Sequence, residues 1–321
     1  MKNILLTGAA GFIGANFTEY ITRKYSSYNL IVLDKLTYAG KMENLKKVEN
    51  KITFIKGDIC DFELVEEIFN KYEIDGVVHF AAESHVDNSI KEPFIFTKTN
   101  VIGTQTLLEV AKRNWGEGSS NKFVHVSTDE VYGTLGETGY FTEKSPIAPN
   151  SPYSASKASS DLIAFAYHET YKMNINVTNC SNNYGPYQHN EKLIPHMIKC
   201  AVEDKQLPVY GQGLNIRDWL YVEDHCEAID LVLHNGKAGG RYNIGGHNEK
   251  RNIDIVELIL KYLNKPESLI SYVEDRKGHD FRYAIDATKI KKDLGWEQKT
   301  KFEDGIIKTI DWYLENKKWL E

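Results

Sequence analysis

Residues 7–14 read TGAAGFIG and place Gly8, Gly11 and Gly14 at GxxGxxG spacing directly after a short apolar run. Glycines in a strand-to-helix turn let the backbone bend tightly and approach a pyrophosphate, which the helix N-terminus attracts. The motif alone is weak evidence, because any tight turn of this kind favours glycine. Asp34 ends the next apolar run, where a carboxylate accepts hydrogen bonds from a ribose 2′-hydroxyl and repels a 2′-phosphate. Together the two features predict a nicotinamide dinucleotide site that prefers NAD to NADP.

Short apolar segments alternate with amphipathic ones through the first half of the chain. The apolar segments are compact and rich in β-branched residues, as buried parallel strands are, and occupy residues 3–8, 29–34, 52–58, 76–82 and 122–128. Helical periodicity is found at 62–72, 100–114 and 151–171, and a further strand is expected at 175–180. This alternation predicts an α/β fold built on a doubly wound parallel (Rossmann) sheet with right-handed crossovers.

The regular alternation stops near residue 180. Loops rich in Gly, Pro and Asn follow, and helical patterns return at 222–236, 252–265 and 302–320. We expect residues 1–178 to form an NAD-binding domain, to which a segment near 218–240 returns. Residues 179–321 are expected to form mainly a smaller α/β substrate-binding domain at the carboxyl ends of the strands, where open α/β sheets bind ligands.

Composition limits the classes of partner. The 321 residues are 41% hydrophobic and 26% charged, and the net charge of −6 argues against nucleic acid, because phosphate binding needs a basic face. Cys60, Cys180, Cys200 and Cys226 are scattered, which predicts reduced thiols and no metal site. No apolar run is long enough to cross a membrane, and the opening MKNILLTGAAGFIG is expected to be a strand and not a signal peptide. We therefore expect a cytoplasmic protein with neither nucleic acid nor membrane as a partner.

The motif YSASK places Tyr153 and Lys157 four residues apart at the start of a helical pattern, and so on one helix face. A free tyrosine has a pKa near ~10 and is a poor base at neutral pH. A neighbouring ammonium favours the phenolate and is expected to lower that pKa. Tyr153 can then remove a hydroxyl proton while a hydride leaves for the nicotinamide. Alone, YxxxK more often marks an ordinary amphipathic helix, so this prediction depends on the dinucleotide motif in the same chain.

The stretch VSTDEVYG at 126–133 puts two adjacent acids, Asp129 and Glu130, after Thr128 at a predicted strand end. Adjacent carboxylates repel and are costly to desolvate, so a pair of this kind is most often a solvated turn. At the carboxyl end of a strand beside a nicotinamide site, the pair instead predicts proton handling. Two close carboxyls in a desolvated pocket tend to share one proton, which separates their apparent pKa values.

These motifs, together with HFAAESHVD at 79–87 and NVIGT at 100–104, resemble the extended short-chain dehydrogenase/reductase family of nucleotide-sugar enzymes. The resemblance runs from residue 1 to beyond residue 280. Its 4,6-dehydratases are most similar, through STDEVYG, NCSNNYGPYQHNEKLIP, IRDWLYVEDH, YNIGGHNEKRN and DRKGHDFRY. The epimerases typically carry small or hydroxylated residues where Asp129 and Glu130 stand. The resemblance implies bound NAD, a dTDP-glucose substrate, and a homodimer formed through helices expected at 100–113 and 155–171.

The reaction implied by this resemblance is redox-neutral. Tyr153 removes the proton of the sugar C4 hydroxyl as NAD+ takes the C4 hydride, and the resulting ketone acidifies the C5 proton. Glu130 is the expected base for that proton and Asp129 the expected acid for the departing C6 hydroxyl, so Asp129 must be protonated while Glu130 is ionised. Hydride then returns to C6, which leaves a 4-keto-6-deoxy sugar. Thr128 is expected to hydrogen-bond the C4 oxygen.

The resemblance also implies binding residues, position by position. Besides Gly8, Gly11, Gly14 and Asp34, the expected cofactor contacts are Phe12, Ile13, Lys35, Leu36, Thr37, Asp58, Ile59, Phe80, Ala81, Ala82, Glu83, Ser84, Thr99, Tyr153, Lys157 and Asn183. The expected substrate contacts are Ser84, Thr128, Asn182, Lys192, Leu193, Pro208, Val209, Tyr210, Arg217, Asn252, Asp275, Arg276, Lys277, Gly278 and His279. Residues 208–210 would line the base, and the guanidinium groups of Arg217 and Arg276 suit a diphosphate.

Two alternatives stay open. A dehydratase or epimerase of a UDP-, GDP- or CDP-sugar would share the fold and most motifs, since base selectivity depends on packing around residues 208–210. A non-catalytic NAD-binding sensor would keep the fold but would be expected to lose the Tyr153–Lys157 pair or the acid pair, and both are intact.

Overall fold

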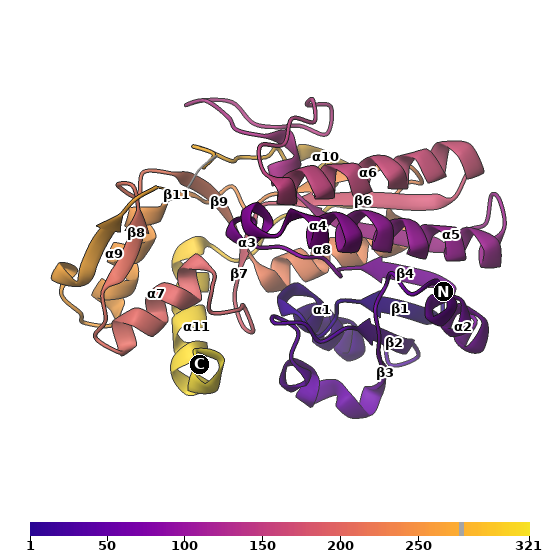
Figure 1. Ribbon diagram of the computed structural model, residues 1–321, viewed down its shortest axis with the longest axis horizontal. Coiled ribbons are helices and arrows are strands. Elements are labelled where there is room, and N and C mark those ends of the chain that lie inside the picture. The colour runs from indigo at the N-terminus through magenta and orange to yellow at the C-terminus, as the bar shows by residue number, and fades with distance from the viewer. Residues whose placement is uncertain (276–278) are drawn as a thin grey trace.

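The computed structural model describes residues 1–275 and 279–321, and its larger part is built on a seven-stranded sheet (Figure 1). In spatial order the strands are β10 (Arg241–Ile244), β6 (Asn174–Cys180), β5 (Lys122–Thr128), β4 (Gly76–His79), β1 (Asn3–Thr7), β2 (Asn29–Asp34) and β3 (Ile52–Lys56). Every neighbouring pair is parallel. The predicted doubly wound parallel sheet is therefore confirmed.

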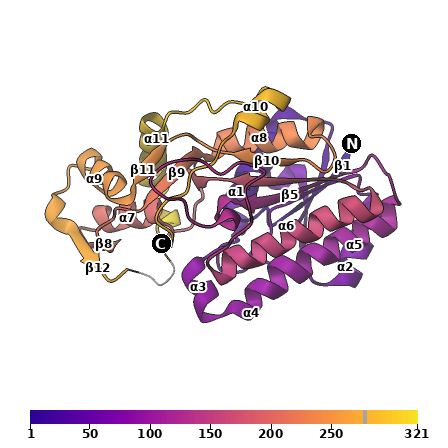
Figure 2. The ribbon, with the colours of Figure 1, turned by 90° about the horizontal axis from the view of Figure 1, so that it is seen from above.

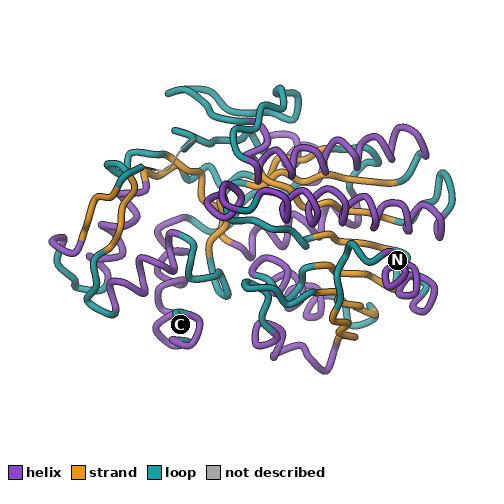
Figure 3. The backbone as a smooth tube through the Cα atoms, in the orientation of Figure 1, coloured by secondary structure: helices purple, strands orange, loops and turns teal. Residues whose placement is uncertain are grey.

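Helices cover both faces of this sheet. One face carries α1 (Phe12–Lys24), the 3-10 helix η1 (Met42–Lys51) and α8 (Val222–Asn235), and the other carries α2 (Phe62–Tyr72), α5 (Thr104–Trp115) and α6 (Pro152–Tyr171). Figure 2 shows α2, α5 and α6 side by side on one face with α8 on the other, and Figure 3 shows the same layering of helices and strands. The chain thus folds into three layers with a core on each side of the sheet.

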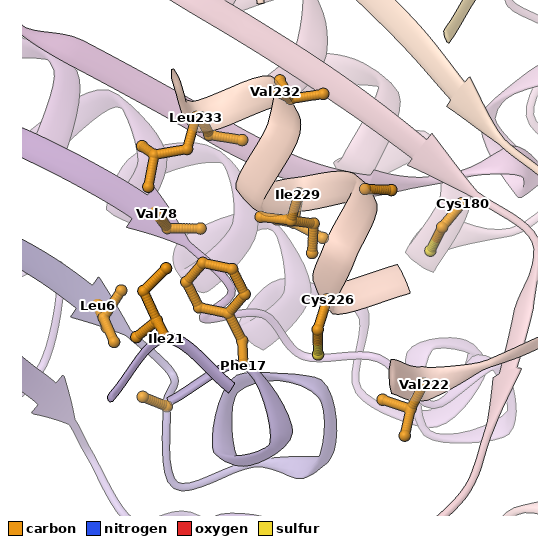
Figure 4. Close-up of a cluster of buried hydrophobic side chains, with 14 of the residues drawn as sticks. Leu6, Phe17, Ile21, Val78, Cys180, Val222, Cys226, Ile229, Val232 and Leu233 are labelled. Carbon is orange, nitrogen blue, oxygen red and sulfur yellow. The ribbon is translucent and has the colours of Figure 1, made fainter. Parts of the chain in front are cut away.

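The alternation of side chains along β1 supplies both cores. Ile4 and Leu6 pack with the side of α1 and α8, whereas Leu5 packs with the side of α2 and α5. Figure 4 shows the first of these cores, in which Phe17 of α1 and Ile229 of α8 converge on the sheet. Strands buried on both faces need continuous apolar sequence, which is why these segments lack the alternation of half-exposed strands.

The smaller part of the molecule is drawn at the left of Figure 1. It contains a three-stranded sheet of β11 (Glu249–Arg251), β9 (Ile216–Tyr221) and β7 (Asn182–Tyr184), and a parallel pair of β12 (Ile270–Val273) and β8 (Leu207–Tyr210). Helices α7 (Leu193–Val202), α9 (Asn252–Tyr262) and α11 (Phe302–Glu315) pack around a separate core. Strand β10 and helix α10 (Thr288–Leu294) lie with the larger sheet. The division into domains at residues 178 and 179 stays a prediction.

The segment predicted as one helix at 100–114 has two parts. Residues Thr97–Gly103 form a π-helical turn, η2, which continues from α4 (Pro93–Phe96) and leads into α5. A side chain at Gly103 would meet the Ile59 side chain within 2.4 Å, so glycine allows the close packing at this junction. Among residues 1–275 and 279–321, no helix combines the length and the apolar character needed to cross a membrane.

Candidate active site

A cavity of about 300 Å³ opens at the carboxyl ends of the central strands, where the strand order reverses between β1 and β4. All five predicted catalytic residues line it: Thr128, Asp129, Glu130, Tyr153 and Lys157. Of the predicted cofactor residues, those that line it are Gly8, Gly11, Phe12, Ile13, Gly14, Asp34, Lys35, Thr37, Asp58, Ile59, Phe80, Ala81, Ala82, Glu83, Ser84, Thr99, Tyr153, Lys157 and Asn183. Leu36 does not line it, because its side chain packs on the core beneath.

The glycine turn brings two backbone segments into direct contact. Gly8 has φ of +68°, and a Cβ atom there would lie 2.5 Å from both the Cα and the N atoms of Ala81 in the loop after β4. Gly11 is the N-cap of α1, no side chain caps this helix, and its first turn carries no acidic residue. Its first backbone N–H groups are therefore available to an anion at the cavity wall. The turn fits a dinucleotide pyrophosphate.

Asp34 ends β2 as a buried carboxylate. Its Oδ2 accepts a hydrogen bond from the Ala10 N–H at 2.9 Å and its Oδ1 accepts one from the Leu36 N–H at 2.8 Å. Burial raises the pKa of Asp34, and these backbone hydrogen bonds oppose the rise. Asp58, another predicted cofactor contact, forms an ion pair with Lys35 at 2.8 Å. A Cβ atom at Gly40 would approach Asp34 Oδ1 to 2.9 Å, so glycine lets this loop pass close to the carboxylate.

The loop 80–84 is held by an asparagine that the sequence analysis did not single out. Asn100 accepts a hydrogen bond from the Glu83 N–H at 2.9 Å and donates to the Glu83 carbonyl at 3.0 Å. It also donates to Ser156 Oγ on α6 at 2.8 Å. Asn100 therefore joins the loop 80–84 to α6, the helix that carries Tyr153.

Tyr153 lies in the first turn of α6, which begins with a capping box between Ser151 and Ser154 and has Pro152 at its first position. One turn further on, Lys157 Nζ donates to the Val126 carbonyl at 2.9 Å. Burial lowers the pKa of Lys157 to about 8. Both side chains face the end of β5.

The pKa of Tyr153 differs from the sequence-based expectation. We expected Lys157 to lower it, whereas it is raised well above its ordinary value, first by burial and then by the negative charge of Glu130. The hydroxyl of Thr128 opposes this rise through a hydrogen bond with Tyr153. The expectation was wrong because it weighed the nearest charge and not the loss of solvent, which favours the neutral phenol.

The acid pair follows β5 directly. Thr128 is the N-cap of the short 3-10 helix η3 (Asp129–Tyr132): its Oγ1 accepts a hydrogen bond from the Glu130 N–H and donates to Asp129 Oδ1, both at 3.3 Å. Asp129 is buried, and its Oδ2 has no hydrogen-bond partner within residues 1–275 and 279–321. Burial, followed by the charges of Glu130 and Asp218, raises the pKa of Asp129 well above its ordinary value. A protonated Asp129 beside the less buried Glu130 is the arrangement that the predicted acid role requires.

The predicted substrate residues divide into two groups. Ser84, Thr128, Asn182 and Lys192 line the cavity, and Lys192 Nζ donates to the Ser84 carbonyl at 2.9 Å. The others that the structure describes do not line it: Leu193, Pro208, Val209, Tyr210, Arg217, Asn252, Asp275 and His279. Arg276, Lys277 and Gly278 lie outside the described residues.

Arg217, predicted to bind a diphosphate, is buried against the segment 280–283. Its guanidinium donates to the carbonyls of Ile216 at 2.8 Å and Asp280 at 2.9 Å, and it lies 4.4 Å from the centre of the Tyr283 ring. These contacts hold the guanidinium near the acid pair. Its positive charge there acts to lower the pKa of Asp129. The diphosphate role of Arg217 stays a prediction.

Several cavity-lining residues were missed from the sequence: Leu33, Ala39, Gly40, Gly57, Val126, Ser127, Cys180, Ser181, Gln188, His189 and Glu191. Five of them are immediate neighbours of predicted residues: Leu33, Gly57, Ser127, Ser181 and Glu191. The quoted motif NCSNNYGPYQHNEKLIP contains Cys180, Ser181, Gln188, His189 and Glu191, and VSTDEVYG contains Val126 and Ser127, so these motifs could have indicated them. In the part of the chain that the structure describes, no three His, Cys, Asp or Glu side chains are grouped to hold a metal ion.

Comparisons with known proteins agree with this site. Residues 5–309 match the family described as GDP-mannose 4,6 dehydratase. The chain is 51% identical to the dTDP-glucose 4,6-dehydratase of Xanthomonas campestris pv. campestris over 338 aligned residues, which cover 100% of this chain and 95% of the relative.

Solved structures give the same result. The dTDP-glucose 4,6-dehydratase of Bacillus anthracis in complex with NAD matches with a TM-score of 0.93 and 51% identity over 100% of both chains. DesIV, the dTDP-glucose 4,6-dehydratase of Streptomyces venezuelae, with NAD and TYD bound, matches with a TM-score of 0.95 and 47% identity over 99% of this chain and 100% of that one. Fold and site thus define an extended short-chain dehydrogenase/reductase, as the motifs indicated. Within that class, the chain belongs to the GDP-mannose 4,6 dehydratase family.

The glycine turn generates a first prediction. Gly8→Ala is expected to weaken NAD binding at least about tenfold, roughly 1.4 kcal/mol, because the new methyl group pushes the turn away from Ala81. Isothermal titration calorimetry of the purified protein with NAD measures this directly.

Gly116→Ala is the matched control for that variant. Gly116 also has a positive φ, of +76°, but a Cβ atom there would meet nothing within 4 Å. Both variants should therefore lose roughly 1–3 kcal/mol of stability from backbone strain, the Gly8 variant more because of its clash with Ala81, and only the Gly8 variant should lose affinity for NAD. Equal NAD affinity in the two variants would contradict the assignment of this turn.

Proposed function

We propose that this chain acts as a dTDP-glucose 4,6-dehydratase, which converts dTDP-glucose into dTDP-4-keto-6-deoxyglucose and water. The observation that carries the proposal is the buried Asp129 beside Glu130, in the same cavity as Tyr153 and Lys157. Water elimination needs an acid and a base at neighbouring carbons, whereas an epimerisation at C4 needs neither. Full-length relatives with about half of their residues identical, which are named for this activity, support the substrate assignment.

In the proposed reaction Tyr153 accepts the proton of the sugar C4 hydroxyl. Thr128 lies close enough to influence the pKa of Tyr153, so its hydroxyl also lies where it can align the C4 oxygen. Bound NAD+ supplies the hydride acceptor, the donor for the later return to C6, and a positive charge at the nicotinamide end of the cavity. The ammonium of Lys157, which is held by its hydrogen bond to the Val126 carbonyl, provides a second positive charge. Both positive charges oppose the desolvation that holds Tyr153 in its phenol form.

The acid pair performs the elimination in this proposal. Glu130, the less buried carboxylate, removes the C5 proton once C4 is a ketone. Asp129 gives its proton to the departing C6 hydroxyl, which leaves as water. The pKa of Asp129 is raised by burial, so the proton is already in place at neutral pH when the reaction begins. After the elimination, Glu130 holds a proton that can return to C5. Before the next turnover Tyr153 gives up the proton that it took from the C4 hydroxyl and Asp129 regains one, so that the protons balance.

The choice of nucleotide is tested with a panel of substrates. The purified protein is incubated with dTDP-glucose, UDP-glucose, CDP-glucose and GDP-mannose, and the alkaline absorbance and mass of the 4-keto product are followed. We expect dTDP-glucose to have the highest kcat/KM, by at least about tenfold, or about 1.4 kcal/mol. Turnover of another sugar nucleotide with none of dTDP-glucose would refute the substrate assignment, and no turnover of any would favour a non-catalytic NAD-binding protein.

The roles of the two acids are tested by Glu130→Gln and Asp129→Asn. Removing a general acid or base typically costs about 10²–10⁴-fold in rate, so each variant should lose product formation to that extent. The Glu130 variant should still oxidise C4, because Tyr153 and Lys157 are unchanged. Reduced-cofactor absorbance should therefore build up after substrate is added, without release of water.

Glu137→Gln serves as the control for these variants, because Glu137 is an exposed acid in the loop after η3. It should retain wild-type turnover. If Glu130→Gln and Asp129→Asn also kept turnover near wild type, the assignment of the acid pair would be wrong.

We further propose that the chain forms a homodimer through the layer of α6 and its neighbours. Exposed apolar side chains gather there on four elements: Ile90 on α3 (Val86–Lys91), Phe94 on α4, Ile102 on η2 and Leu162 on α6. Phe94 is 88% exposed, which is unusual for an aromatic side chain in a monomer. Ile102 and Leu162 fall within the two helices from which dimerisation was expected.

Phe94→Asp is expected to convert the dimer into a monomer, because a carboxylate at the centre of an apolar contact cannot be desolvated cheaply. Light scattering after size-exclusion chromatography measures the mass. Tyr272→Asp is the control, because Tyr272 is 59% exposed on β12, away from this layer. A monomeric wild-type protein, or a Phe94 variant that stays dimeric, would disprove this interface.

We also infer a cytoplasmic location. Cys60, Cys180, Cys200 and Cys226 are free thiols. Thiols persist in a reducing compartment, which supports this inference. Cell fractionation that placed the protein in an oxidising compartment would contradict it.

A further inference from the structure

Asp161 is a fully buried carboxylate on α6 that the reaction above does not use. We propose that Asp161 is a positioning residue for the catalytic pair: its carboxylate holds Lys157 in the charged ammonium form and, through Asn179, fixes the carbonyl of Thr128 at the start of the acid turn. This inference rests on the proposed function, because it assigns Asp161 to the proton transfer made by Tyr153.

The geometry of α6 places Asp161 in line with the catalytic pair. Tyr153, Lys157 and Asp161 are spaced four residues apart and so lie on one helix face, which is turned toward β5 and β6. Lys157 is 3% exposed and Asp161 is 0% exposed. A buried ammonium needs a counter-charge, because one carbonyl acceptor does not replace its hydration. Burial lowers the pKa of Lys157 to about 8, and Asp161 is the largest influence that opposes the fall.

Asn179 on β6 joins Asp161 to the acid turn. Its Nδ2 group donates to the Thr128 carbonyl at 2.9 Å and to Asp161 Oδ2 at 3.1 Å. Each hydrogen of the amide group is thus assigned to one acceptor. Asp129 and Glu130 directly follow Thr128 in the chain. By holding Asn179, the carboxylate of Asp161 therefore fixes the backbone from which the acid pair projects.

The ionisable neighbours of Asp161 on β4 and β5 are two neutral histidines, which add no second negative charge beside it. His125 Nε2 lies 3.3 Å from Asp161 Oδ1 and 3.0 Å from Ser160 Oγ. Burial lowers the pKa of His125 to about 4, so this histidine is neutral and acts as a hydrogen-bond donor. His79 lies behind it, and burial lowers its pKa as well.

The remaining neighbours are a cation and two weak acids. Arg241 Nη2 on β10 lies 3.8 Å from Asp161 Oδ2, and burial raises the pKa of both Tyr132 on η3 and Cys180 on β6. Burial alone would also raise the pKa of Asp161, but the nearby His125 and the charges of Arg241 and Lys157 lower it overall. Asp161 is therefore ionised at neutral pH and shared between two cations.

Asp161→Asn tests the charge, because the amide keeps an acceptor oxygen for Asn179 and removes the negative charge. We expect the alkaline limb of the pH profile of C4 oxidation to move down by at least about one pH unit, which corresponds to about 1.4 kcal/mol. The sign follows from Lys157, which would lose its proton at lower pH without the carboxylate. KM for the sugar nucleotide should stay near its wild-type value. Ser160→Ala, which leaves the carboxylate and removes a neighbouring hydroxyl, should not move the limb.

A second readout needs no turnover. The tyrosinate ultraviolet absorbance of the NAD-loaded protein is titrated with pH, with Tyr153→Phe as the blank. In Asp161→Asn the Tyr153 contribution should develop at higher pH than in the wild-type protein, because the ammonium that favours the phenolate is lost earlier. If no sugar nucleotide is turned over by the wild-type protein, the proposed function fails, and this titration still decides the role of Asp161.

The outcomes separate positioning from a purely structural role. The proposal would be overturned if, in Asp161→Asn, the alkaline limb and the tyrosinate titration fell at the same pH as in the wild-type protein. This holds even if the activity of the variant were lower at every pH. If Asp161→Asn does not fold, as judged by thermal unfolding and NAD content, Arg241→Gln is used instead. That variant removes the cation that competes for the carboxylate, so it should move the alkaline limb to higher pH. An unmoved or lowered limb would again overturn the proposal.

Discussion

The close approach of the β1 turn to the loop after β4 is the constraint on which the rest of the site depends. From this point the order of the parallel strands proceeds toward opposite edges of the sheet, to β2 and β3 on one side and to β4, β5 and β6 on the other, so the loops that follow them diverge and leave a crevice. Gly8 lets the two backbones touch beneath the crevice, since a methyl group at this position would clash with the backbone of Ala81 at 2.5 Å. The uncapped start of α1 and the carboxylate of Asp34 then face the same space.

Burial governs the chemistry of the cavity more than any single pair of charges does. Desolvation is the largest influence on the pKa of Tyr153, Lys157 and Asp129, and in each case it favours the neutral form. In the proposed mechanism this suits Asp129, which has to carry a proton. Desolvation of Tyr153 and Lys157 has to be opposed, and we propose that bound NAD and the carboxylate of Asp161 supply the opposing charges. A dry site therefore needs a supporting layer of charge that is not in contact with the substrate.

Agreement between sequence and structure is closest where local pattern decides. The strands at 29–34 and 122–128 and the helix at 62–72 were predicted at their observed bounds, because buried strands and amphipathic helices write their period into the residues. Agreement is weaker at the π-helical turn before α5, where packing of Gly103 against Ile59 changes the local geometry. Several cavity-lining residues were missed although they belong to quoted motifs: Ser127 stands in VSTDEVYG, and Cys180 and Gln188 stand in NCSNNYGPYQHNEKLIP. A motif marks a segment, but which of its side chains face the cavity depends on how the segment is packed.

By itself the sequence determined the sheet, the dinucleotide turn and which predicted catalytic residues would meet in one cavity, because each is expressed by residues close together in the chain. The tertiary structure decided the properties that depend on distant segments. It raised the pKa of Tyr153 where a neighbouring ammonium was expected to lower it, turned the guanidinium of Arg217 toward backbone carbonyls, and placed Asp161 of α6 and Thr128 of β5 on the same amide of β6. Solvent exclusion and through-space charge depend on the packed arrangement of all these elements, and no local spacing of residues encodes them.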